Sequence, residues 1–124
     1  MIDSRWLIFA LTGAVFILMV VVMVMPIQPF TMHIKSLNDN SLTHGSFFLG
    51  SGSIDEEPVF VTYVMLNNGG YKLKTIPAGE FTTIYEDDPP VPYVYVWGST
   101  CFLYYEIHVP KGTIIQAYNL DGKL

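Results

Sequence analysis

The first hydrophobic pattern along the chain is one long apolar run. Residues 6–25 contain no charged side chain, and only Thr12 and Gly13 fall outside the apolar class. An α-helix rises about 1.5 Å per residue, so about 20 residues span about 30 Å, the hydrocarbon thickness of a bilayer. The pattern predicts a transmembrane helix over residues 6–26, after an N-terminal stub at residues 1–5.

Four residues are expected to contact the bilayer from this helix: Trp6, Phe9, Phe16 and Pro26. Trp6 is placed for an interfacial aromatic anchor, and Pro26 ends the helix. A cleaved signal peptide is the alternative, but its apolar region is usually about 7–15 residues long and precedes small residues. Residues 24–28 offer no such cleavage site, so the pattern favours an uncleaved anchor.

The basic residues beside the run indicate an orientation. Arg5 precedes the apolar run, and Lys35 is the first basic residue after it. The positive-inside rule therefore favours a cytoplasmic N-terminus. We expect a single-pass protein whose C-terminal domain lies outside the cytoplasm, in a periplasm, outside a cell or on a virion.

Beyond the run, the hydrophobic pattern changes to period two. Residues 27–43 follow Pro26, contain Pro29 and many polar residues, and are predicted to form a linker. Residues 44–124 alternate, with turn residues about every eight to twelve positions, which is typical of a small antiparallel β-sandwich or barrel of about six to seven strands. The strands are expected at 47–49, 59–66, 71–76, 81–85, 91–97, 102–109 and 113–118, with turns at 50–52 and 67–70.

Composition narrows the function classes. The chain is 51% apolar and 14% charged, and the excess apolarity lies in the predicted helix. The net charge of −5 and the scattered basic residues exclude a nucleic-acid-binding surface. Cys101 is the only cysteine and is expected to be a small buried side chain, with an intermolecular disulfide as the alternative. No cofactor or metal site is expected.

One predicted strand carries alternating aromatic residues. Tyr93, Tyr95 and Trp97 share one face, and Val94 and Val96 share the other. Because both faces are apolar, the strand could be central and covered on both sides. Alternatively, the aromatic face could be a recognition surface, since tyrosine and tryptophan are enriched in interface hot spots.

The next predicted strand has a polar face. Tyr104, Glu106 and His108 lie on it with Phe102, and we expect the opposite set, at 103, 105, 107 and 109, to be core. Glu106 and His108 could form an acid–base pair, but neighbours of this kind usually form a polar exterior. The acidic triplets at 55–57 and 86–88 are expected to be solvated loop ends.

Three stretches carry a resemblance: residues 46–52 (SFFLGSG), 70–77 (GYKLKTIP) and 108–114 (HVPKGTI). Together they resemble a group of small hypothetical proteins of bacteriophages and prophages, which have one N-terminal span and a short β domain. The resemblance implies envelope modification, superinfection exclusion or an accessory part of an assembly. It implies no catalytic residue.

The leading hypothesis is therefore a non-enzymatic protein that is anchored in the lipid bilayer through residues 6–26 and binds another protein with its β domain. The alternative is a small structural or accessory subunit of a membrane or virion complex. A third hypothesis, the least favoured, is an enzyme or ligand sensor built around the aromatic strand and His108.

Overall fold

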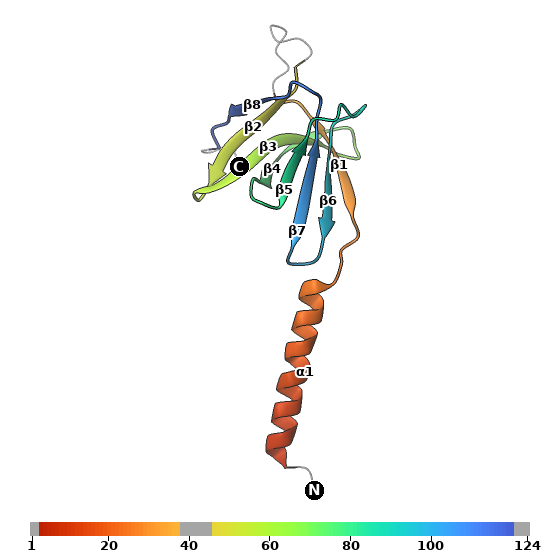
Figure 1. The fold of residues 1–124 in the computed structure, drawn as a ribbon, viewed down its shortest axis with the longest axis vertical. Helices are drawn as coiled ribbons and strands as arrows, with labels where there is room; N and C mark the ends of the chain where they lie inside the picture. The colour runs from red at the N-terminus through yellow and green to blue at the C-terminus, as the bar shows by residue number, and fades with distance from the viewer. Residues whose placement is uncertain (1–2, 38–45, 121–124) are drawn as a thin grey trace.

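The computed structural model describes residues 3–37 and 46–120, as one helix that projects from a β domain (Figure 1). The elements in chain order are α1 (Ser4–Val24), β1 (Phe30–Lys35), β2 (Phe48–Ile54), β3 (Glu57–Met65), β4 (Tyr71–Pro77), β5 (Thr82–Tyr85), β6 (Tyr93–Gly98), β7 (Leu103–His108) and β8 (Ile114–Ala117).

The predicted N-terminal helix is confirmed, with slightly different ends. Asp3 caps it, because its carboxylate accepts a hydrogen bond from the Arg5 amide at 3.3 Å. Met25 is extended rather than helical, since the α region is disfavoured for the residue before a proline. None of the residues of α1 is buried against the domain, and the helix is long and apolar enough to cross a membrane.

The strands of the described residues form one curled sheet in the order β5-β7-β6-β1-β3-β2-β8, with β4 paired to β3. Strand β1 joins the two halves, because residues 30–33 pair with β6 whereas Ile34 and Lys35 pair with β3. The all-β class is confirmed. The prediction of a purely antiparallel sheet is wrong, since β2 pairs with β8 and β5 with β7 in parallel. Each of these pairs joins strands that are separated along the chain by other strands.

The hydrophobic core lies inside the curl and draws on both halves of the sheet. Its buried members are Ile34, Phe47, Leu49, Val64, Ile76, Val94, Val96, Ile107 and Val109. Thr62 is a polar residue that is also fully buried, and its hydroxyl donates to the Lys35 carbonyl oxygen at 3.2 Å. The core therefore fixes which faces of β6 and β7 point outward.

Strand β1 corrects the predicted linker at 27–43. Ile34 is only 2% exposed and belongs to the core, whereas Thr31, His33 and Lys35 point outward. The alternation is therefore present, but it is only six residues long and lies between prolines and a polar stretch, so the composition of its surroundings hid it. Residues 38–43 of the predicted linker lie outside the described residues.

Strand β2 corrects the turn predicted at 50–52. A Cβ on Gly50 would lie 2.6 Å from Leu37 Cδ1, and one on Gly52 would lie 2.8 Å from the Tyr118 carbonyl oxygen. These glycines therefore permit a close approach within the fold and do not turn the chain. The turn comes at Asp55 and Glu56, whose φ angles of 49° and 68° suit a two-residue hairpin loop.

Candidate binding face

Strands β6 and β7 expose one face and bury the other. Val94, Val96 and Ile107 are 0% exposed. The outward side chains are Tyr93, Tyr95, Trp97, Tyr104, Glu106 and His108, all of them half-buried or exposed. The aromatic face of β6 is thus outside the core. The expected core face of β7 is confirmed, since Ile107 and Val109 are fully buried and Leu103 and Tyr105 pack against the core.

The antiparallel register of β6 and β7 merges the two predicted candidates into one surface. Tyr93 pairs with His108, Tyr95 with Glu106, and Trp97 with Tyr104. Side chains that are directly opposite in a sheet lie close enough to interact. The sequence presented these residues as two separate sets, whereas the register makes them neighbours.

His108 lies between two tyrosine rings. Its imidazole stacks on Tyr93 with centroids 4.4 Å apart, and on Tyr85 with centroids 4.9 Å apart. Tyr85 comes from β5, whose parallel pairing places it directly beside His108. The histidine side chain is consequently only 12% exposed, although it lies on the outward face of the sheet.

Both ring nitrogens of His108 face carboxylates. Nδ1 lies 2.6 Å from Asp87 Oδ2, and Nε2 lies 3.1 Å from Glu106 Oε1. Ionised carboxylates only accept hydrogen bonds, so the imidazolium, with a hydrogen on each nitrogen, is the form that donates to both. Because both nitrogens are engaged, neither is open to act as a general base on a substrate in this arrangement.

Glu106 links the histidine to a second aromatic cluster. Its Oε2 accepts a hydrogen bond of 2.8 Å from Trp97 Nε1. The Trp97 ring stacks on Tyr104 at 4.3 Å, and Phe81 meets Tyr104 edge-on at 5.2 Å. A continuous network therefore runs from Asp87 through His108 and Glu106 to Trp97.

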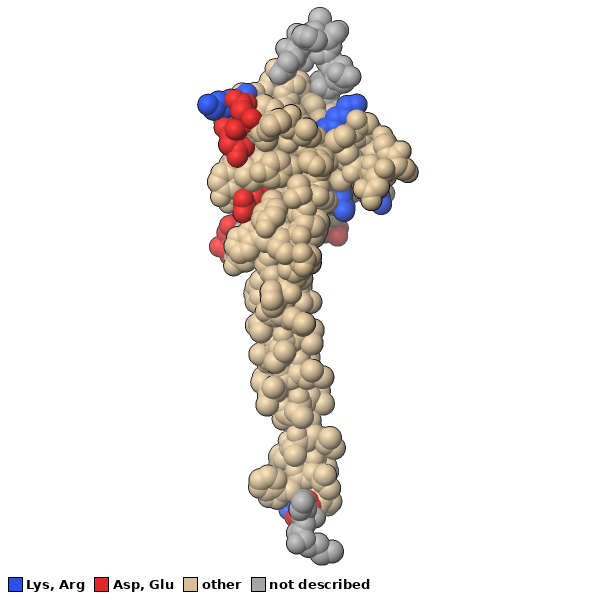
Figure 2. Space-filling view, turned by 90° about the vertical axis from the view of Figure 1, so that its right-hand side faces the viewer, with Lys and Arg blue, Asp and Glu red and all other residues tan. Residues whose placement is uncertain are grey.

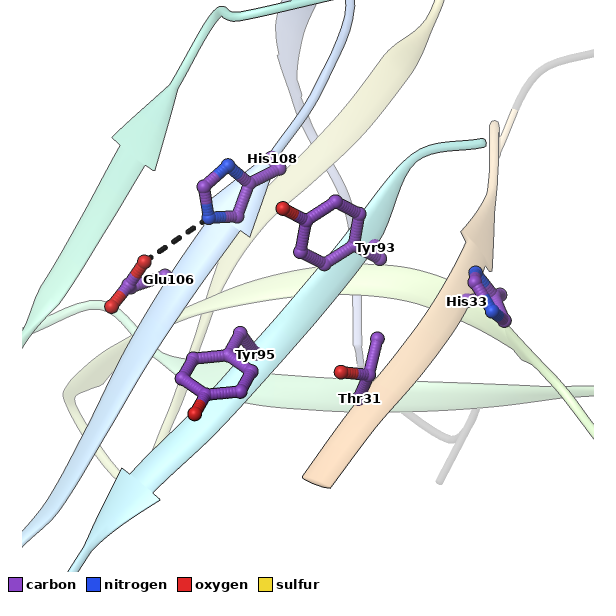
Figure 3. Close-up of a pocket in the computed structure, with 6 residues that line it drawn as sticks. All are labelled: Thr31, His33, Tyr93, Tyr95, Glu106 and His108. Atoms are coloured by element: carbon purple, nitrogen blue, oxygen red, sulfur yellow. Dashed lines mark hydrogen bonds and ion pairs between the residues drawn. The ribbon is translucent and has the colours of Figure 1, made fainter. Parts of the chain in front are cut away.

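A shallow depression of about 480 Å³ opens beside this network (Figure 3). It is lined by Thr31 and His33 of β1, Tyr93 and Tyr95 of β6, and Glu106 and His108 of β7. Figure 3 shows the Tyr95 ring beside Glu106, with Thr31 and His33 on the far side. Rings together with a carboxylate suit a cationic side chain, which gains from both π-faces and charge pairing.

Four residues of this face escaped the sequence analysis. Thr31 and His33 fell in the predicted linker, and their alternation with Ile34 was the signal that could have found them. Asp87 was assigned to a solvated acidic triplet, and Tyr85 to an ordinary strand end. Only the parallel pairing of β5 with β7 brings these two to His108.

The predicted membrane residues lie apart from this face. Trp6, Phe9 and Phe16 on α1 are 71%, 75% and 67% exposed, and Pro26 forms an isolated bridge with Ser99 of the domain. The expectation that Cys101 is buried is wrong, since it is exposed in the loop between β6 and β7. Within residues 3–37 and 46–120, no group of three or more histidine, cysteine or acidic residues could hold a metal ion.

Comparison with family models, curated proteins and solved structures finds no match to this chain. The resemblance to phage proteins therefore stays a prediction.

Proposed function

We propose that this protein is a membrane-anchored binding domain. In this proposal α1 crosses a bilayer as an uncleaved anchor, the β domain lies outside the cytoplasm, and a partner protein binds at the depression lined by Tyr93, Tyr95, Glu106 and His33. We also propose that the curled sheet is a small sandwich or barrel, since β1 pairs with a strand of each half.

The exposure of α1 supports the anchor. The 21 residues of α1 are mostly large and apolar, and none of them is buried in the domain. Water is an unfavourable surrounding for so much apolar surface, and lipid is a favourable one. A signal sequence is the other role for such a helix. Intact-mass measurement of the mature protein, from both the membrane and the soluble fraction, separates the two, because cleavage would remove the mass of α1.

The chemistry of the depression supports a partner that offers lysine or arginine. The observation that carries this is the pairing of Tyr95 with Glu106 across β6 and β7 at the edge of the depression. The Glu106 side chain is 29% exposed, so its carboxylate is accessible although it is already hydrogen-bonded. An arginine could pair with the carboxylate while its guanidinium stacks on the tyrosine ring.

A short arginine peptide tests this directly. We expect it, added to the full chain in detergent micelles, to shift the amide resonances of residues 31–33, 95 and 106. Glu106→Gln should remove most of these shifts, because it deletes the charge but keeps an oxygen that accepts from Trp97. Glu57→Gln, at the exposed start of β3, is the matched control and should leave them unchanged.

The proposal would be contradicted if the peptide shifted the amide resonances of Glu106→Gln as much as those of the unchanged chain. It would also be contradicted if the largest shifts lay at the acidic residues 55–57. The alternative role, as a structural or accessory subunit of a membrane or virion complex, predicts instead that the chain purifies with other subunits at fixed stoichiometry. An enzyme would be indicated only by a measured turnover that is lost when Glu106 or His108 is replaced.

A further inference from the structure

The loop between β6 and β7 is attached to the end of α1 (Figure 1). The Thr100 amide donates to the Met25 carbonyl oxygen at 3.3 Å, and the Thr100 hydroxyl approaches the same oxygen at 3.5 Å. The Ile27 amide donates to the Gly98 carbonyl oxygen at 3.0 Å. These bonds hold the loop at the level of the last turn of the helix.

The loop itself is tight. The Ser99 amide donates to the Phe102 carbonyl oxygen at 2.9 Å, and the Phe102 amide donates back to Ser99 at 3.3 Å. Gly98 has a φ of +131°, and a Cβ there would lie 2.1 Å from the Phe102 carbonyl oxygen, so the position requires glycine. The side chains of the loop are therefore carried at a defined height relative to α1.

The surface beside the loop is apolar. Phe102 is 51% exposed and Phe81 is 45% exposed, and Cys101 is also exposed. They border a cavity of about 270 Å³ between this loop and the β4–β5 connection, and none of the residues that line it is charged. Figure 2 shows no charged side chain on the visible face along most of α1, whereas acidic side chains appear at the edge of the lower part of the domain.

We infer that this loop, together with Phe81, lies in the interfacial region of the bilayer that α1 spans. The helix has 21 residues, which correspond to about 31 Å, so a spanning α1 places Met25 near the edge of the hydrocarbon. Thr100 is hydrogen-bonded to Met25 and must lie at that depth. Exposed aromatic rings are favourable there, and the headgroup side of the interface accommodates the polar backbone of the loop.

The occupant of this surface is therefore lipid from the surrounding bilayer, with acyl segments against Phe102 and Phe81 at the mouth of the cavity. The inference rests on the proposed anchoring by α1. It adds that the β domain is seated on the membrane through a second contact, which fixes the orientation of the Tyr95 and Glu106 face relative to the bilayer.

The unique thiol of Cys101 allows a direct test. The full chain, labelled there with an environment-sensitive fluorophore, is reconstituted in phosphatidylcholine vesicles that carry nitroxides on the headgroup or at shallow or deep acyl positions. We expect the headgroup and shallow acyl quenchers to quench the label several-fold more than the deep one. Phe102→Ser should weaken the quenching by the shallow acyl position.

The matched control is Cys101→Ser combined with Lys111→Cys, which moves the label to the exposed turn after β7, at the end of the domain away from α1 (Figure 1). That label should be quenched far less. The emission of Trp6, isolated by Trp97→Phe, reports independently on whether α1 is in the bilayer, because the chain has two tryptophans.

If Trp6 is quenched but the labels at 101 and 111 are quenched equally, the inference is overturned and the anchor by α1 still holds. Unquenched Trp6 would overturn the anchor itself, and the inference with it.

Discussion

The two faces of strands β6 and β7 are both rich in apolar residues, yet they have different roles. Val94, Val96 and Ile107 are fully buried against the other half of the sheet. The opposite face holds large aromatic rings that pack on each other, with Tyr93 stacked on His108 and Trp97 on Tyr104. Apolarity alone therefore does not identify a core. Rings with polar edges are kept outside, where their N–H and O–H groups can meet carboxylates or water.

The largest expected effect comes from the buried face. Ile107→Ala removes a fully buried side chain at the centre of the core and should lower the free energy of unfolding by about 2–5 kcal/mol. Chemical denaturation of the full chain in detergent, followed by circular dichroism, measures it. If Ile107→Ala lowered the free energy of unfolding by less than His108→Ala, the proposed difference between the buried and the outward face would be wrong.

A smaller effect is expected on the outward face. His108→Ala removes a ring stacked between two tyrosines and leaves the carboxylates of Asp87 and Glu106 without their shared partner, for a cost of about 1–3 kcal/mol. His33→Ala, at an exposed histidine on β1, is the control and should change stability by less than about 0.5 kcal/mol. Equal effects at the two histidines would mean that the network around His108 contributes nothing to the fold.

The smallest effect on the free energy of unfolding is expected from a substitution at Trp97, which removes a hydrogen bond of the outward face but keeps the ring stacking. Trp97→Phe deletes the N–H that donates to Glu106 but keeps an aromatic ring over Tyr104, and should cost about 0.5–1 kcal/mol. Trp6→Phe is the control on α1 and should leave the unfolding of the β domain unchanged. If Trp97→Phe lowered the free energy of unfolding more than His108→Ala, Trp97 and not His108 would contribute most to the stability of this face.

Local patterns were enough for the elements that are long or regular. The apolar run predicted α1 to within two residues at each end, because the run itself and Pro26 are local signals. The Asp3 cap, which starts the helix two residues before the apolar run, was not predicted. Strands β3, β4, β6 and β7 follow their alternation in the same way. Strand β1 and the length of β2 were missed, because their defining contacts, Ile34 in the core and the close neighbours of Gly50 and Gly52, come from distant parts of the chain.

The candidate face was only half accessible from the sequence. Period two placed Tyr93, Tyr95 and Trp97 on one face of a strand, and Tyr104, Glu106 and His108 on one face of another. The short loop between β6 and β7 makes these strands a hairpin, but nothing local fixed their register or indicated that Tyr85 and Asp87 complete the surroundings of His108. The register of β6 with β7 decides which side chains of the hairpin lie opposite each other. The parallel pairing of β5 with β7, which are separated by β6 along the chain, is the long-range contact that brings Tyr85 to His108.

The sequence by itself therefore determined a 21-residue apolar helix followed by a β domain, because helix length and strand alternation are written in neighbouring residues. Only the tertiary structure decided which side of β6 faces the core, since both of its sides are apolar and burial depends on what packs against them. It also decided that His108 has two carboxylate partners, and that the β6–β7 loop meets the end of α1. Each of these requires the chain to return to a place that no local pattern specifies.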